Sequence, residues 1–158
     1  MSARIDRKFR PYWKNYVFQS SLAALTIFLL LLLLNLEHVV VIAAIGATAF
    51  IVFAMPGDIT ARSRNIIGGH LVGFAVGSLC ALLPQPWVCL SMLVYSLAVG
   101  LSVLIMVTID TEHPPAAATA LGMAITGFSH DAAVAVVTSV ILLALAHHFL
   151  KPFFKDLV

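Results

Sequence analysis

Long uncharged apolar runs restrict this chain to a membrane-embedded helical architecture. The first run, residues 17–36, is twenty residues long and carries no charged side chain. Roughly 20 apolar residues are what an α-helix needs to cross a bilayer. In the whole chain 61% of residues are hydrophobic and 10% are charged, whereas soluble domains carry about 25% charged residues. The sequence leaves no segment suited to a water-soluble domain, and we expect a polytopic membrane protein.

Polar and proline-containing interruptions divide the chain into six apolar segments. Pro56-Gly57, Pro84-Gln85-Pro86 and Ser129-His130-Asp131 are typical turn sequences between them. The fold class we expect is all-α, with six transmembrane helices at residues 17–36, 39–55, 66–83, 87–109, 115–128 and 132–150. The chain then has three parts: a basic interfacial segment at 1–16, a transmembrane domain at 17–150 and a cytoplasmic tail at 151–158.

Basic residues fall on only one side of this six-span arrangement. With six spans, the N-terminal segment, the loop after the second span, the loop after the fourth span and the C-terminal tail share one face. Lys and Arg concentrate on the cytoplasmic side of membrane proteins, so both termini are predicted to be cytoplasmic. That face holds all nine Lys and Arg residues, namely Arg4, Arg7, Lys8, Arg10, Lys14, Arg62, Arg64, Lys151 and Lys155.

The fifth span is too short to cross the hydrocarbon core without help. Its fourteen residues, 115–128, cover about 21 Å at the helical rise of 1.5 Å per residue. The core is ~30 Å thick. Glu112 and His113, which precede this span, are therefore expected to lie below the cytoplasmic surface, in a recess that water reaches.

The two halves of the chain show an internal similarity at an offset of 75 residues. Residues 21–38 align with residues 96–113, and the alignment places Glu37 and His38 over Glu112 and His113. Since the two halves start on opposite faces, this predicts an inverted repeat with Glu37 and His38 as a pseudo-symmetric site. Inverted-repeat transporters bind substrate at the interface of the repeats. Coincidence between Leu- and Ala-rich helices remains the alternative.

Small residues line one face of the third span and one face of the fifth. Gly69, Gly73 and Gly77 are spaced by four, so they lie on one side of a helix. Such a face allows close backbone approach. We expect it to pack against Ala116, Ala120 and Ala124 and to bring the N-termini of both spans together.

The polar residues at these two helix N-termini form the candidate site. Pro114 and Pro115 suit the first turn of a helix, whose positive end favours anions. Arg64 would attract a small anion, Asn65 would cap the third span, and His113 would donate a hydrogen bond. The candidate substrate-binding residues are His113, Glu112, Pro114, Pro115, His70, Arg64, Asn65, Asp110 and Thr119.

Each of these residues also has a plainer interpretation. Arg62 and Arg64 are equally suited to setting topology, and His70 to an interhelical hydrogen bond. His147 and His148 are better explained as interfacial residues. Asp110, Glu112, His113 and His70 can all ligate metals, but their spacing is not that of a helical ligand pair, so no metal site is predicted. Cys80 and Cys89 flank a turn and would be small packing residues or a disulfide.

The sequence EHPPAAATALG, with SRNIIGGHLVG upstream, resembles the HPP family, which is named for its His-Pro-Pro motif. The resemblance covers roughly residues 17–150. It implies a small integral membrane protein of bacteria or plant plastids, and plastid members are associated with nitrite transport. The family is usually described with four spans, whereas the charge distribution here indicates six.

The expected function is that of a small-anion channel or transporter, with nitrite as the leading substrate. A proton-linked or metal cation permease is the alternative, and a non-transporting regulatory or structural subunit is a third. We expect no enzymatic activity, no cofactor and no nucleic-acid partner. The expected partners are the anion, the lipid bilayer and further copies of the chain, in a bacterial inner membrane.

Overall fold

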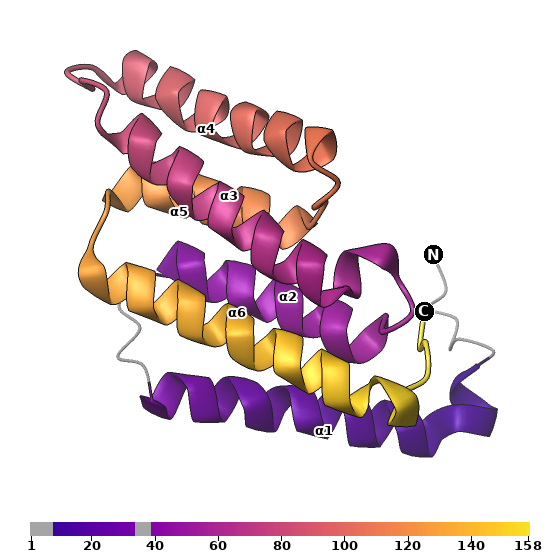
Figure 1. Cartoon of the computed structure of the whole chain (residues 1–158). Coiled ribbons are helices and arrows are strands. Elements are labelled where there is room, and N and C mark those ends of the chain that lie inside the picture. The colour runs from indigo at the N-terminus through magenta and orange to yellow at the C-terminus, as the bar shows by residue number, and fades with distance from the viewer. Residues whose placement is uncertain (1–7, 34–38) are drawn as a thin grey trace, which may run out of the picture.

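The computed structural model describes residues 8–33 and 39–158, which form a bundle of helices without a β-strand (Figure 1). Arg4, Arg7, Glu37 and His38, to which the sequence assigned roles, lie outside the described residues. The helices are α1 (Phe9–Leu33), α2 (Val39–Ala54), α3 (Ser63–Ala81), α4 (Val88–Thr108), α5 (Pro114–Thr126) and α6 (His130–Leu150), with short 3₁₀ helices η1 (Ile59–Ala61) and η2 (Lys151–Phe153).

Each predicted apolar segment corresponds to one helix, and local sequence explains most of the boundaries. Pro114 and Pro115 occupy the first turn of α5, where their fixed φ is already helical. Gly127 ends this helix with a φ of 77°, which glycine adopts at little cost. The side chain of Ser129 caps α6 by accepting from the N–H of Ala132. The largest difference is in α1, which begins at Phe9 and kinks at Tyr12.

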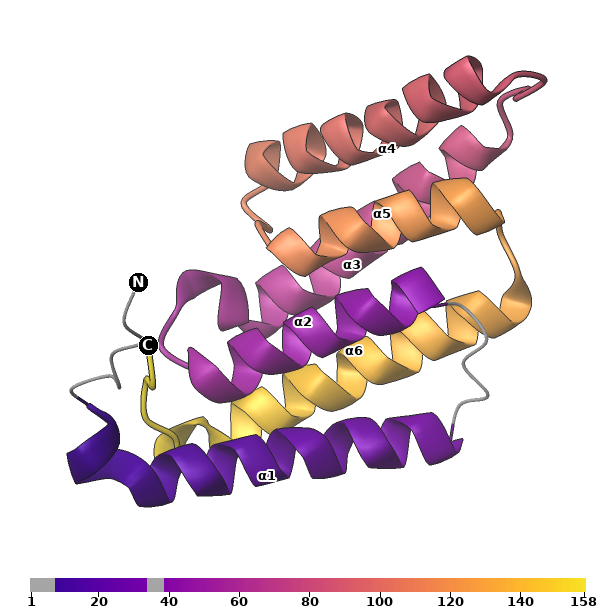
Figure 2. The same ribbon diagram turned by 180° about the vertical axis from the view of Figure 1, so that it is seen from behind.

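Three helices, α1, α4 and α6, are long and apolar enough to cross a membrane. Residues 42–54 of α2 form a shorter apolar helix, and α5 has only thirteen residues. Successive helices run in alternating directions, so the start of α1 and the end of α6 lie at one end of the bundle (Figures 1 and 2). The structure is therefore that of an all-helical membrane protein.

Contacts at this end join segments that are far apart in the sequence. The Nζ of Lys8 donates to the carbonyl of Val158 at 2.8 Å. The carboxylate of Asp156 accepts from the N–H of Gly57, also at 2.8 Å. Residues 151–158, which the sequence suggested as a tail, thus pack along the ends of α1 and α2.

A buried glutamine holds the C-terminal segment in place. The side chain of Gln19 in α1 donates to the carbonyls of Phe53 and Lys155 and accepts from the N–H of Lys155. Further along, the N–H of Leu157 donates to the carbonyl of Ala54 at 2.9 Å. The C-terminal segment therefore joins α1 to the end of α2.

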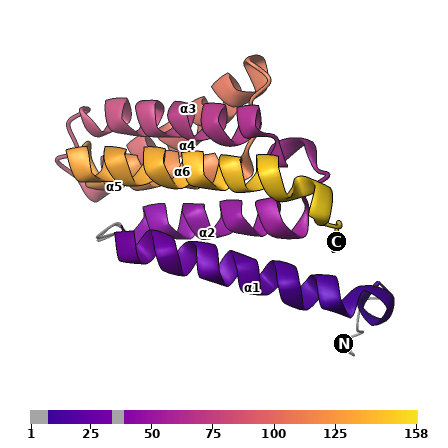
Figure 3. The ribbon, with the colours of Figure 1, turned by 60° about the horizontal axis from the view of Figure 1, so that its bottom comes forward.

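Helices α2, α3 and α5 form the centre of the bundle, and the other helices pack around them. Figure 3 shows α2 between α1 and the group of α3, α5 and α6, and α2 packs on α1, α5 and α6. The most extensive contact in the bundle is between α3 and α5, while α4 packs on both of them. The helices α1 and α4 lie on opposite outer sides, which leaves their outer faces exposed (Figure 1).

Two local expectations from the sequence are wrong. Helix α3 starts at Ser63, with Arg62 at its N-cap, so Asn65 lies inside the first turn and does not cap it. His147 is buried rather than interfacial, because its Nε2 bonds the carbonyl of Pro56 at 3.0 Å. His148 is exposed. Cys80 and Cys89 are both free thiols, the first buried and the second exposed.

Candidate functional site

The site is built where the glycine face of α3 meets the start of α5. A Cβ atom added to Gly69 would lie 2.7 Å from the Cβ of His113. One added to Gly73 would strike the carbonyl of Ala116, and one added to Gly77 would strike that of Ala120. The glycines therefore let α3 approach the backbone of α5 itself, as their spacing predicted. Ala124, the third alanine, does not meet a glycine but shares a core cluster with Val76 and Cys80 of α3 and with Val94 and Ala98 of α4.

Two buried histidines from the facing helices share one threonine hydroxyl. The Nε2 of His70 is 2.8 Å from the Oγ1 of Thr48 in α2. The Nε2 of His113 is 3.0 Å from the same oxygen. The two imidazole rings are 5.0 Å apart between centroids. Thr48, to which the sequence analysis gave no role, therefore links the two histidines.

The outer nitrogens of both imidazoles are also bonded. The Nδ1 of His70 lies 2.8 Å from the Oγ1 of Thr119 in α5. The Nδ1 of His113 lies 2.8 Å from the carbonyl oxygen of Thr60 in η1. Together these contacts form a continuous chain from Thr119 through His70, Thr48 and His113 to Thr60. His70, His113, Thr48 and Thr119 are at most 1% exposed, so the two imidazoles are held by protein groups in the interior of the bundle.

Glu112 and His113 face a cavity on the α4 side of the chain. This cavity has a volume of about 270 Å³ and is lined by Glu112, His113, Pro114, Ala117 and apolar side chains of α4. The Oε2 of Glu112 and the Oγ1 of Thr111 are buried without a hydrogen-bond partner. A recessed space beside His113 was expected from the short fifth span, and this cavity matches that expectation.

The arginines expected at the site lie on the surface instead. Arg64 pairs with Asp110 at 2.8 Å, and the two side chains are 63% and 67% exposed. Arg64 also donates to the carbonyl of Ile109. Arg62 is exposed as well. The pair fixes the loop before α5, in which Asp110 has a φ of 56°, and leaves the imidazoles as the groups in the interior.

Asn65 has a structural role that differs from the one predicted. It is buried, and its Nδ2 donates to the carbonyl of Glu112 at 3.0 Å. This bond holds the residue before His113 against the first turn of α3. Asn65 therefore positions the histidine without facing the cavity.

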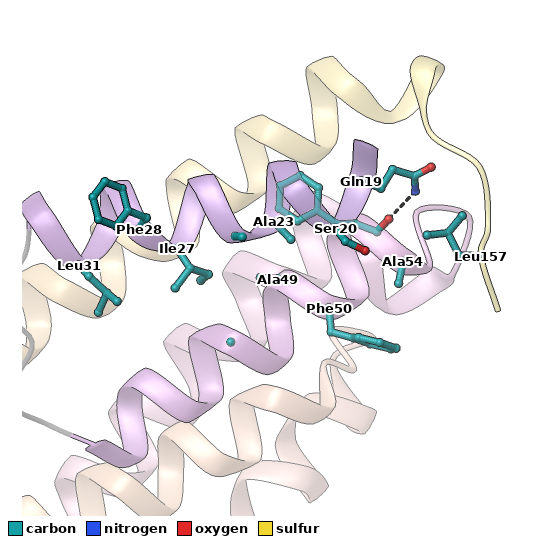
Figure 4. A pocket seen from close by; sticks show the side chains of 13 residues that line it. Gln19, Ser20, Ala23, Ile27, Phe28, Leu31, Ala49, Phe50, Ala54 and Leu157 are labelled. Carbon is teal, nitrogen blue, oxygen red and sulfur yellow. Dashed lines mark hydrogen bonds between the residues drawn. The ribbon is translucent and has the colours of Figure 1, made fainter. Parts of the chain in front are cut away.

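Within residues 8–33 and 39–158, no group of three or more His, Cys, Asp or Glu side chains is placed to hold a metal ion. A second cavity, of about 570 Å³, lies between α1 and α2 (Figure 4). Its walls are mainly apolar, with Gln19 and Ser20 the polar side chains along it. Its lining residues include no titratable side chain. It is separate from the hydrogen-bonded series that contains His70 and His113.

Comparison with known proteins supports a membrane assignment. A transmembrane protein of Dictyostelium discoideum is 34% identical to the chain over 88 residues. That match covers 56% of this chain and 31% of the Dictyostelium protein, so the chain spans under a third of its relative. No solved structure matches the chain.

The family assignment rests on nearly the whole helical region. Residues 9–153 match the family described as "HPP, transmembrane region". The match includes the His113-Pro114-Pro115 motif, the glycine face of α3 and all six α-helices. The chain therefore belongs to the HPP family of membrane proteins.

Proposed function

We propose that this protein is a small-anion transporter or channel, with nitrite as the leading substrate and the anion held beside His113. The observation that carries the proposal is a buried imidazole that opens on a recessed cavity at the start of α5. Membership of a membrane family and the three membrane-length helices support a role in transport.

For binding an anion, the imidazole of His113 matters more than the backbone N–H groups at the start of α5. Pro114 and Pro115 have no N–H, and the N–H of Ala116 bonds the carbonyl of His113 at 2.8 Å. The first three residues of α5 therefore offer no free donor to an anion, although the helix dipole remains positive there. Both nitrogens of His113 bond other residues, so a protonated His113 supplies positive charge beside the cavity rather than a free N–H.

We propose further that all six helices cross the membrane, with both termini cytoplasmic. The described basic residues support this, because they belong to the helix ends and loops at one end of the bundle. Cysteine accessibility labelling at Arg62 and Lys151 in cells tests it. Labelling from the cytoplasmic side at both positions is expected, and labelling of either one from outside contradicts six crossings.

The packing of the helices supports the inverted repeat. Exchanging α1 with α4, α2 with α5 and α3 with α6 maps the α1–α2 contact onto α4–α5, and the α3–α5 contact onto α2–α6. The α2–α5 and α3–α6 contacts map onto themselves. Two contacts depart from this symmetry: α3–α5 is far more extensive than its α2–α6 counterpart, and the close packing of α4 on α3 has no equally close counterpart between α1 and α6. Glu37 and His38 as a second site remain part of this proposal.

A proton-linked or metal cation permease is the second candidate, and one observation favours it. The Oε2 of Glu112 is buried at the cavity without a partner. A buried carboxylate is costly unless it is protonated or meets a cation, so the same cavity would suit a cation if Glu112 is charged. A non-transporting subunit is the third candidate. We keep the bacterial inner membrane, the homo-oligomer and the lack of enzymatic activity as expectations.

Flux through purified protein in liposomes decides among these functions. Nitrite, nitrate, formate and divalent cations are supplied in turn, and protein-free liposomes give the background. Uptake of nitrite or another small anion above background supports the proposal. Uptake of cations alone supports the second candidate, and no uptake of any ion supports the third.

A further inference from the structure

We infer that Thr48, His70 and His113 form a binding site for one proton, in which the Thr48 hydroxyl turns between His113 and the carbonyl of Ala44. The distances that carry this inference are those from Thr48 Oγ1 to the two Nε2 atoms, 2.8 and 3.0 Å, and to the Ala44 oxygen, 3.0 Å. The proton site itself does not depend on the proposed function. Its coupling to anion transport does.

The neutral state follows from which atoms can donate. The carbonyl of Thr60 can only accept, so the Nδ1 of His113 carries a hydrogen and donates to it. The Nε2 of a neutral His113 is then an acceptor, and the Thr48 hydroxyl donates to it. Having used its one hydrogen, Thr48 accepts from the Nε2 of His70. The Nδ1 of His70 accepts in turn from the Thr119 hydroxyl. Every link is satisfied in one direction.

Adding one proton gives a second arrangement that is equally complete. An O–H bond of a hydronium ion breaks and leaves a water molecule, and the proton forms one new N–H bond at the Nε2 of His113, which becomes an imidazolium. Both Nε2 atoms then donate to Thr48, whose oxygen has two lone pairs. The Thr48 hydrogen turns to the Ala44 carbonyl. No other covalent bond forms or breaks, and the net charge of the site rises from zero to one.

Few other titratable side chains lie near Thr48, His70 and His113. Helix α2 and helix α4 contribute no acidic, basic or histidine side chain over residues 39–54 and 88–108. Asp58 beside η1 is occupied by Thr60, whose hydroxyl and N–H hold the pKa of that carboxyl below its usual range. Arg64 and Asp110 neutralise each other on the surface, and His147 of α6 bonds Pro56. The carboxyl of Glu112 lines the cavity beside His113.

The chain of hydrogen bonds also connects two cavities on opposite sides of α3 and α5. His113 lines the cavity of about 270 Å³ next to α4. His70 lines another of about 110 Å³ between α3 and α6. A proton on His113 therefore places a positive charge at the cavity proposed for the anion. Anion binding there is expected to bring one proton with it.

The first test reads the histidine tautomers and needs no transport. Nitrogen NMR of ¹⁵N-histidine protein in lipid, assigned with His113→Gln and His70→Gln, is measured at neutral pH. The expected result is a hydrogen on Nδ1 of His113 and on Nε2 of His70. The opposite tautomer at either residue overturns the inference.

The second test measures proton movement with the anion. Liposomes containing the protein and the internal pH dye pyranine receive nitrite from outside, with protein-free liposomes as background because nitrous acid crosses lipid unaided. Acidification above background is expected. Thr48→Val should reduce it at least tenfold, Thr48→Ser should keep at least half, and Thr26→Val should not change it, since Thr26 donates only to Leu22 of its own helix.

The outcomes separate this inference from the proposed function. Nitrite uptake without acidification, or equal acidification by Thr48→Val and Thr48→Ser, overturns the inference and leaves anion transport standing. Failure of the wild type to carry any anion overturns the proposed function. The proton site then stands or falls on the tautomers, which also decide the case if Thr48→Val does not fold.

Discussion

Two helix contacts in this protein differ in how closely the chains approach. Between α3 and α5, glycines bring the backbones together so tightly that a Cβ at Gly73 would strike the Ala116 carbonyl. Between α1 and α2, larger side chains leave a cavity of about 570 Å³ (Figure 4), and a Cβ at Gly46 would meet nothing within 4 Å. Apolar character is common to both contacts, and only the small residues produce close packing.

This difference in the distance between helix backbones explains where buried, hydrogen-bonded side chains can lie. Histidine and threonine side chains are short, so they bridge three helices only where the backbones are close. His70, Thr48 and His113 do this beside the α3–α5 contact. Buried polar groups of this kind are costly without partners, and close packing supplies the partners. The wider α1–α2 contact is instead closed at one end by Gln19.

The largest expected effect comes from bulk added to the close contact. Gly73→Leu should destabilise the protein by at least about 3 kcal/mol, the upper end for overpacking, because the obstructing atom is backbone. Thermal unfolding and the yield of monodisperse protein measure it. Gly46→Leu is the matched control in α2 and should be within about 1 kcal/mol of wild type, since its position is open. Equal effects of the two changes would remove the contrast between the contacts.

Removing the imidazole of His113 tests the chemistry of the close contact. His113→Ala should reduce anion flux at least tenfold while the bundle remains folded, because it removes the positive charge that a protonated imidazole brings to the cavity. Flux is measured in liposomes across the range in which histidine titrates. His113→Gln should retain more flux if hydrogen bonding is the main role, and as little as His113→Ala if proton transfer is. A wild-type rate and pH profile in His113→Ala would show that the motif only starts a helix.

A moderate effect is expected at the wider contact. Gln19→Ala removes the bond to the buried carbonyl of Phe53 and the part-buried bonds to the backbone of Lys155, which costs about 1–3 kcal/mol, mainly at the buried carbonyl. Lower thermal stability and faster proteolysis after α6 are the measurements. Ser20→Ala, one residue further along the same cavity, is the control and should match wild type. Unchanged proteolysis in Gln19→Ala would show that the C-terminal segment is held by other contacts.

The smallest effect is expected on the surface. Arg64→Ala breaks an ion pair whose side chains are more than 60% exposed, and such pairs contribute about 0–1 kcal/mol. Thermal unfolding in low and high salt measures this. Asp110→Asn should behave in the same way. If either change abolished anion flux while the fold remained stable, the surface pair would belong to the transport site after all.

Much of the fold could be predicted from the sequence, because its causes are local. Apolar runs predicted the helices, Pro114 and Pro115 predicted the start of α5, and the spacing of four predicted the glycine face. The recess beside His113 followed from the shortness of the same helix. These features depend on helix periodicity, on the position of proline and on the length of each apolar segment.

The missed residues depend on contacts between distant segments. Thr48 and Thr60 lie in α2 and η1, and only the packing of α2 against α5 brings them to His113. Asn65 was misplaced because α3 begins at Ser63, and His147 because its partner, Pro56, lies in a distant loop. A polar residue such as Thr48 in an otherwise apolar span was the available signal.

The docking of residues 154–158 has a consequence for the order of assembly during synthesis. These residues are translated after all six helices, yet they bond Gln19 of the first helix and the end of the second. The contact between α1 and the rest of the bundle therefore cannot be completed at this end until residues 154–158 have been synthesised. The helix that is made first must wait for a segment that follows the sixth helix.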